Sequence, residues 1–242
     1  MGVERQTQMN TSYLRRLRSP RSLKAILSDR SSGRPCRKLV IDYSSPNIAK
    51  QFHIGNLRST LIGRYLDKVH RAIGDEVTSV NYLGDWGTQF AMIATYWPQA
   101  FWKSSSDVDK IRALTDCYVV ANKKGKTDEH FREKVRETYA AMESSVTNGD
   151  LSSPTMQLWK DIRQISERHL NHFYSMLNVA FDKWQYESSY VTAARRLVSD
   201  MIKDEMVRPT SNGLWVVDLQ NEELEDYAIL RKSDSTTIYL SR

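Results

Sequence analysis

Four residues near the middle of the first hundred could together bind an anion: His53, Gly55, Asn56 and Arg58. An imidazole and a guanidinium can donate hydrogen bonds to phosphate oxygens, and a glycine lets a phosphate or a flat ring approach the backbone. A helix that begins at this point would add unpaired N–H groups and the positive end of its dipole. We therefore expect this stretch to bind an adenine nucleotide.

The elements that must position these residues can be predicted from the flanking pattern. Leu39–Ile41 is a short apolar run without an amphipathic period, as in a strand buried on both faces of a parallel sheet. Ser44–Asn47 breaks that strand, because Pro46 cannot donate to a ladder and restricts the residue before it. Apolar residues then recur every four positions over Leu57–Val69, which predicts a helix with one apolar face.

A second strand and a second polar turn follow this helix. Val77–Leu83 has a strand pattern, so the order strand, helix, strand predicts a right-handed βαβ unit, half of a nucleotide-binding fold. Gly84–Gly87 would lie at the carboxyl end of the second strand, where open α/β sheets bind their ligands. Its glycines are also explained by a turn alone. Thr88–Trp97 is predicted to be a helix that stops at Pro98.

The pattern between residues 100 and 207 is helical. Three stripes of apolar residues predict packing faces, on Ile111, Leu114, Tyr118 and Ala121, on Val135, Tyr139 and Met142, and on a long helix capped by Ser153-Pro154. On that helix we expect Lys160, Arg163 and Arg168 to face solvent. His169 and His172 have a spacing that a metal could use, but without a third ligand nearby a solvated or hydrogen-bonded pair is favoured.

Strand patterns return near the end of the sequence. Leu214–Leu219 and Tyr227–Arg231 are predicted strands, and Thr236–Leu240 is expected to pair with the second of them across a turn at Ser233–Ser235. We therefore expect residues 211–242 to form a β-hairpin that returns to the sheet.

Composition and charge bound the class of protein. The net charge of +6 is concentrated in residues 1–38, where ten basic residues stand against two acidic ones, so that residues 39–242 carry −2. This Arg- and Ser-rich segment is typical of a mitochondrial transit peptide, with a disordered basic arm or a nuclear signal as alternatives. The two cysteines, Cys36 and Cys117, are too far apart for a Cys-x-x-Cys site and fit a reducing compartment. No apolar run approaches the roughly 20 residues that span a bilayer, and we expect no membrane association.

Two motifs carry a resemblance to a known family. Residues 39–63 resemble the signature sequence of class I aminoacyl-tRNA synthetases, and Ser44–Asn47, Phe52–Gly55 and Leu57–Thr60 match the arginyl-tRNA synthetases in particular. Asn81–Phe90 matches the same family at a sensible distance downstream. The resemblance runs from about Lys38 to the last residue, with a looser middle.

The resemblance implies a fold and a function. The fold would be α/β, the first half of a class I nucleotide-binding, Rossmann-like domain, with residues 39–98 as its first βαβ unit, 99–210 as a largely helical insertion and 211–242 as the hairpin. The activity would be that of an arginine–tRNA ligase, which forms arginyl-adenylate from arginine and ATP with Mg²⁺ and passes it to tRNA(Arg). No metal site of the protein's own is implied. We expect a monomer in the mitochondrial matrix, or in the cytoplasm if residues 1–38 are not a transit peptide.

The resemblance also assigns roles residue by residue. His53, Gly55, Asn56 and Arg58 would bind ATP, and His53 and Asn56 would stabilise charge at the α-phosphate. The arginine substrate would be held by side chains on both sides of the signature turn and near the end of the chain, namely Asp42, Asn47 and Tyr239. Asp42, which stands where the family has a glutamate, has as its alternative role the capping of the turn that follows it.

Two departures and two alternatives remain. Asn56 replaces the second histidine that the family usually has, and Asp42 is one methylene shorter than glutamate. The family's next aspartate would fall one residue past Arg242, and no Lys-rich loop or C-terminal helical domain follows. One alternative is therefore a truncated, inactive fragment that acts as a binding or structural protein. The other, a different class I synthetase or a nucleotidyltransferase, is disfavoured by the Ser-Ser-Pro-Asn and Gly-Asp-Trp-Gly segments.

Overall fold

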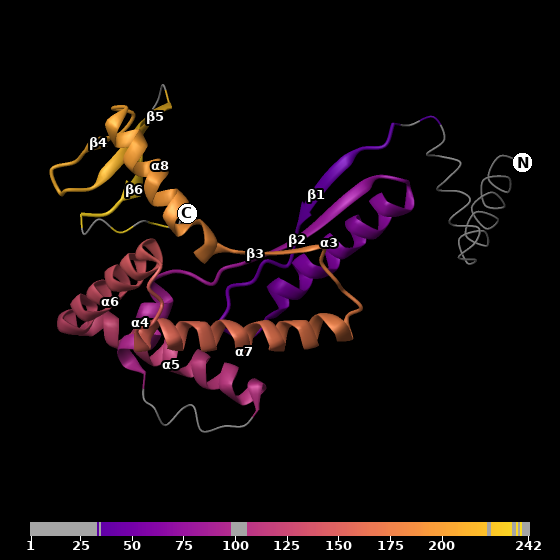
Figure 1. Cartoon of the computed structure of the whole chain (residues 1–242), viewed down its shortest axis with the longest axis horizontal. Helices are drawn as coiled ribbons and strands as arrows, with labels where there is room; N and C mark the ends of the chain where they lie inside the picture. Colours follow the sequence, from indigo (N-terminus) through magenta and orange to yellow (C-terminus); the bar gives the residue numbers. More distant parts are fainter. Residues whose placement is uncertain are drawn as a thin grey trace, which may run out of the picture. The chain divides into compact units, whose positions relative to one another are not determined.

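A computed structural model describes residue 33 and residues 35–97, 106–221, 224–233, 236 and 238. The elements are labelled as in Figure 1. The described residues divide into two compact units, which we treat separately. The first contains residues up to 44 together with 54–81 and 181–183, and the second contains residues 45–53, 82–180 and 184 onward. The predicted α/β class is confirmed.

The first unit is built on the predicted strand, helix and strand, which lie side by side in Figure 1. These are β1 (Lys38–Asp42), α3 (Ile54–Ala72) and β2 (Glu76–Leu83), with β1 and β2 parallel from Lys38 opposite Glu76 to Asp42 opposite Val80. A third strand, β3 (Lys183–Tyr186), gives the sheet the order β1-β2-β3. β2 and β3 continue from the first unit into the second.

Two burial predictions for this unit are wrong. β1 is half-buried on one face, at Leu39 and Ile41, and exposed on the other, where Val40 is 74% exposed. On α3 the buried positions are Thr60, Gly63 and Asp67. The apolar stripe predicted to pack inward instead faces solvent over much of its length, at Leu61, Ile62, Tyr65 and Leu66.

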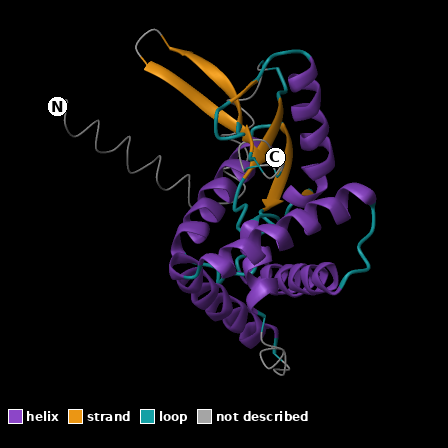
Figure 2. Ribbon diagram, turned by 90° about the vertical axis from the view of Figure 1, so that its left-hand side faces the viewer, coloured by secondary structure: helices purple, strands orange, loops and turns teal. Residues whose placement is uncertain are grey.

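Helices make up most of the second unit. All described helices are purple in Figure 2. Those of the second unit are α4 (Thr88–Tyr96), α5 (Asp107–Thr127), α6 (Glu129–Asn148), α7 (Pro154–Met176) and α8 (Val191–Lys203), with a 3₁₀ turn, η2 (Glu187–Tyr190), before α8. The helices α4 to α7 pack on one another, and the members of the first two predicted stripes are buried except for Tyr118, which is half-buried. In the third stripe, Ile162, Ile165 and Leu170 are buried, whereas Leu158, Phe173 and Leu177 are half-buried. The stop predicted at Pro98 lies outside the described residues.

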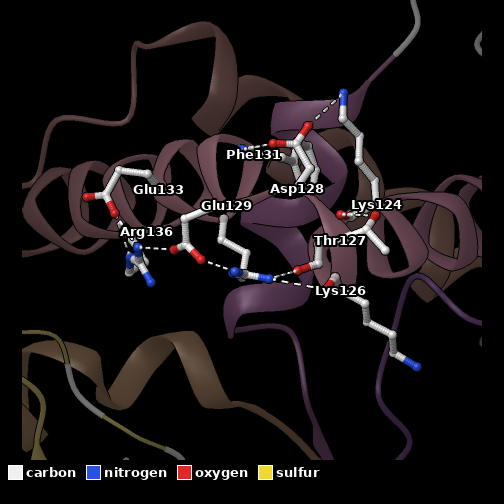
Figure 3. A network of polar contacts seen from close by, with 10 residues as sticks. Lys124, Lys126, Thr127, Asp128, Glu129, Phe131, Glu133 and Arg136 are labelled. Carbon is white, nitrogen blue, oxygen red and sulfur yellow. Dashed lines mark hydrogen bonds and ion pairs between the residues drawn. The ribbon is translucent and has the colours of Figure 1, made fainter.

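Local polar contacts set the helix ends. Ser153 caps α7 by accepting a hydrogen bond from the Met156 amide at 3.3 Å, as predicted. At the junction of α5 and α6, the Asp128 carboxylate accepts from the Phe131 amide at 2.9 Å, and the ion pairs of Glu129 continue along α6 (Figure 3). These contacts turn the chain sharply between two helices.

The end of the described chain differs from the prediction. β4 (Arg208–Pro209), β5 (Trp215–Asn221) and β6 (Leu224–Arg231) form a three-stranded antiparallel sheet of their own, where we expected a hairpin joined to the first sheet. This sheet packs on α8 through Val198, Val207 and Leu230. The Lys232 amide donates to the Thr236 carbonyl at 3.0 Å, across the predicted turn. Most of the strand expected at Thr236–Leu240 lies outside the described residues. Within the part that is described, we find no helix with the length and hydrophobicity that a membrane-spanning segment requires.

Gly63 sets how closely α3 approaches the end of β1. A Cβ atom at Gly63 would overlap the Cβ and Cγ atoms of Tyr43, which are too close to the backbone to move aside. We expect Gly63→Ala to lower the free energy of unfolding by about 1–3 kcal/mol, as overpacking does. The matched control is Gly125→Ala in α5, where the new atom would come no closer than 3.9 Å to Phe131. There helix propensity should raise stability by up to about 1 kcal/mol. Denaturant unfolding measures both, and equal effects would contradict the packing argument.

Candidate functional site: the signature turn and the Gly-Asp-Trp-Gly loop

The turn after β1 has an unusual backbone. The Tyr43 amide still donates to the Val80 carbonyl at 3.1 Å, so the strand ladder continues to this residue. Ser44 and Ser45 then adopt left-handed conformations with φ of 68° and 42°. Such conformations cost roughly 1–2 kcal/mol for each residue with a side chain, so the surroundings must hold them. The predicted break at Ser44–Asn47 is confirmed.

Side chains of α3 hold Ser44 in place within the first unit. The Thr60 hydroxyl lies 2.8 Å from the Ser44 hydroxyl and 2.7 Å from the Asn56 carbonyl, and the Ser44 amide donates to the Ser59 hydroxyl at 3.3 Å. Thr60 is fully buried, so these contacts are shielded from water. The Ser59-Thr60 pair of the signature therefore stabilises the strained turn at Ser44.

The predicted site residues of the first unit lie at the end of β1 and at the start of α3. Asp42 is the last residue of β1 and is exposed. Gly55 and Arg58 are exposed in the first turns of α3, and Asn56 between them is half-buried. No acidic residue occupies the first turn of α3. The positive end of the helix dipole therefore favours an anion there.

The other two predicted residues of the signature belong to the second unit. Asn47 pairs with Gly84 in a parallel bridge, and the Gly84 amide and carbonyl bond to Pro46 and Ile48 at 3.1 and 3.2 Å. A Cβ atom at Gly84 would overlap the Asn47 side-chain oxygen. His53 is exposed and immediately precedes the first residue of α3. Tyr239 lies outside the described residues.

The Gly-Asp-Trp-Gly loop is tied to other elements by Asp85. Its side chain is fully buried and accepts hydrogen bonds from the Ser188 amide at 2.8 Å and the Ser188 hydroxyl at 2.7 Å. The Arg163 guanidinium lies 3.6 Å away, and the Trp159 indole donates to the Asp85 carbonyl at 2.7 Å. Burial raises the pKa of Asp85, and Ser188 and Arg163 oppose that rise. Sequence reasoning missed this role, because no local pattern links Asp85 to Ser188.

Arg163 does not lie on a solvated face, as we had expected. Its guanidinium stacks 3.6 Å from the centre of the Tyr186 ring, and its Nε atom bonds to Glu167 at 2.9 Å. Only 28% of its side chain is exposed. Arg163 therefore connects α7 to β3 and to the buried Asp85.

The two histidines of α7 differ in their exposure to solvent. Burial lowers the pKa of His169, whereas His172 is exposed. Among the residues that the structure describes, no group of three His, Cys, Asp or Glu side chains could hold a metal ion.

Comparison with known proteins identifies the class. Residues 22–242 match the family described as "tRNA synthetases class I (R), catalytic domain". The chain therefore belongs to the class I tRNA synthetase catalytic domains. Within this class its relatives are arginine–tRNA ligases. The probable mitochondrial enzyme of Bos taurus is 32% identical over 89% of this chain and 36% of its own length. Arginine–tRNA ligase 2 of Bacillus anthracis is 36% identical over 86% of this chain and 36% of its own length.

Solved structures agree in fold. The arginyl-tRNA synthetase of Plasmodium falciparum matches with a TM-score of 0.59 at 24% identity, over 92% of this chain and 39% of that one. The Thermus thermophilus enzyme matches with a TM-score of 0.57 at 19% identity, over 90% of this chain and 37% of that one. The chain thus spans a little over a third of the length of these relatives.

The buried Asp85 predicts a specific dependence of stability on pH. A carboxyl whose pKa is raised by folding favours the folded state at low pH, and this contribution is lost as the pH rises through the raised value. The unfolding free energy of the unmodified chain minus that of Asp85→Asn should therefore fall as the pH rises from about 4.

Asp107→Asn is the control with the opposite sign. Arg168 lowers the pKa of Asp107, so the contribution of Asp107 is lost as the pH falls through its lowered value. The unfolding free energy of the unmodified chain minus that of Asp107→Asn should therefore grow as the pH rises. Denaturant unfolding between pH 3 and 8 measures both, and parallel slopes for the two variants would contradict the assignment.

Proposed function

We propose that this chain supplies the nucleotide- and arginine-binding part of an arginine–tRNA ligase. Such an enzyme forms arginyl-adenylate and pyrophosphate from arginine and ATP, and then transfers arginine to the 3′ end of tRNA(Arg). The observation that carries the proposal is the family match over residues 22–242, which includes both motifs. The exposed first turn of α3, free of acidic residues, supports the binding of an anionic nucleotide.

Each predicted residue has a role in this proposal. His53, Gly55, Asn56 and Arg58 bind ATP, whose phosphates carry the Mg²⁺. His53 and the helix amides stabilise the charge that develops at the α-phosphate, and the amide group of Asn56 replaces an imidazole N–H without its charge.

Arginine is recognised by residues of complementary chemistry. Asp42 accepts from the planar guanidinium, for which a carboxylate is the best partner. Asn47, with its amide group fixed against Gly84, holds the amino end of the substrate, and Tyr239 contributes to the pocket for the side chain. No covalent step involves the protein, so catalysis consists of positioning and charge stabilisation.

His53 provides the test of the nucleotide role. The activity is measured as arginine-dependent ATP–pyrophosphate exchange in a full-length chimera, in which residues 39–221 replace the aligned region of the Bacillus anthracis relative. His53→Ala should slow exchange by ~10²-fold or more, as the loss of one transition-state donor does. His172→Ala, an exposed histidine of α7, is the matched control and should leave the rate unchanged.

Asn56→His extends this test. Restoring the family's second histidine should raise the rate or leave it unchanged. Unchanged exchange in His53→Ala would contradict a role of His53 at the phosphates. A large fall in Asn56→His would contradict the view that Asn56 merely replaces an imidazole.

A second candidate function is binding without catalysis. It is favoured by the apolar stripe of α3, where Leu61, Tyr65 and Leu66 are 50%, 67% and 41% exposed. Exposed apolar patches of this kind mark surfaces that another polypeptide covers. A chimera that folds but exchanges no pyrophosphate, with or without changes at His53, would favour this function.

We also propose import into mitochondria, which rests on the basic segment 1–38 and on relatives named as mitochondrial in Bos taurus, Mus musculus and Homo sapiens. Fused to a fluorescent protein, residues 1–38 should direct it to mitochondria. Replacement of Arg15, Arg16, Arg18 and Arg21 by glutamine should abolish import, because the positive charge drives it. Microscopy and fractionation measure the outcome, and a diffuse cytosolic or nuclear signal from the unmodified fusion would contradict the proposal.

A further inference from the structure

The segment Ser45–His53 packs with the helices of the second unit and is grouped with them rather than with β1 or α3. Its interior is buried and its site residues are exposed. Ile48 and Ala49 are 2% and 1% exposed, whereas Asn47 and His53 on either side of them face solvent. Buried anchors thus alternate with exposed functional side chains.

Ala49 is the strained point of this segment. It adopts a left-handed conformation with φ of 62°, which an alanine rarely takes because its Cβ crowds the backbone. A residue stays in this region only where its surroundings fix it. Ala49 lies two residues after Asn47 and four before His53. A change in the φ angle of Ala49 would therefore redirect both side chains.

Ser166 of α7 supplies the constraint. Its hydroxyl oxygen accepts a hydrogen bond from the Ala49 amide at 3.4 Å, and the same hydroxyl donates to the Ile162 carbonyl at 2.7 Å. The residue is only 3% exposed, so water cannot replace it as a partner. Only a side chain that accepts and donates through one atom fits both contacts.

Neighbouring contacts support the same arrangement. The Lys50 ammonium lies 4.8 Å from the centre of the Tyr118 ring on α5. The Phe52 ring packs 4.3 Å from Phe173 and 6.1 Å from Tyr174, both on α7. Helices α5 and α7 therefore hold the segment along its length, although the sequence predicted only packing stripes for them.

We infer that Ser166 is a positioning residue for the signature segment: by holding Ala49 in its left-handed conformation, it sets the directions of Asn47 and His53. It touches no substrate itself. The inference rests on the proposed function for its catalytic consequence, but the structural part stands alone.

Amide hydrogen exchange on the full chain tests the structural part. Ser166→Ala should speed exchange at the Ala49 amide by roughly five- to tenfold, as expected when one hydrogen bond is lost. Ser175→Ala is the matched control. The Ser175 hydroxyl also donates to a carbonyl of α7, that of His172 at 2.6 Å, but Ser175 is exposed and lies near the C-terminal end of α7, away from Ser166. It should leave the Ala49 amide unchanged. Ser166→Thr keeps the hydroxyl and should restore protection.

Pyrophosphate exchange in the chimera described above tests the catalytic consequence. Ser166→Ala should lower kcat/KM for arginine by ~10- to 100-fold, because small misplacements of binding groups have effects of this size. Ser166→Thr should recover most of the activity, and Ser175→Ala should lose none.

Two results would overturn the inference. One is unchanged protection at Ala49 in Ser166→Ala. The other is a loss of activity that Ser166→Thr does not recover although it restores protection. If the unmodified chimera is inactive, the proposed function fails, and the protection data still decide whether Ser166 holds the segment.

Discussion

The buried carboxylate of Asp85 is the interaction on which the second unit depends. An isolated charge at a fully buried position would cost several kcal/mol, and here Ser188 and Arg163 offset part of that cost. These partners come from η2 and α7, so the carboxylate fixes where three parts of the chain meet. The adjacent Gly84 bonds to Pro46 and Ile48 through its backbone. The second motif therefore supports the first, which explains in physical terms why the two occur together.

The elements that sequence predicted well are those with local signals. A change of period between apolar runs predicts β1, α3, β2 and α4. Ser153-Pro154 marks the start of α7, because a cap acts within one turn. β3 and η2 were not predicted, since they lie inside a region whose overall pattern is helical. α8 lies in the region predicted to be helical, but its own bounds were not predicted. The four residues of β3 are too few to show a period.

The candidate site was predicted only in part, for a related reason. The ends of the strands and the start of α3 could be located, because open α/β sheets place ligands there. Contacts between distant residues could not. Ser188 is 103 residues from Asp85, and Ser166 is 117 residues from Ala49. A serine in a helix has no pattern that reveals which amide it will accept from, so these constraints become visible only in three dimensions.

The inverted burial of α3 shows how a correct periodicity can lead to a wrong prediction of packing. The helix has one apolar face, yet Asp67 lies inside, paired with Arg64 and Arg71. Arg71 continues to Asp182, whose pKa is held below its usual value by the Ser79 amide and hydroxyl and by Arg71 itself. This network joins α3 to the sheet through polar contacts, so the helix does not need its apolar stripe for that contact. The apolar pattern shows which residues of the helix share one face. The polar residues on the opposite face decide which of the two faces packs on the sheet.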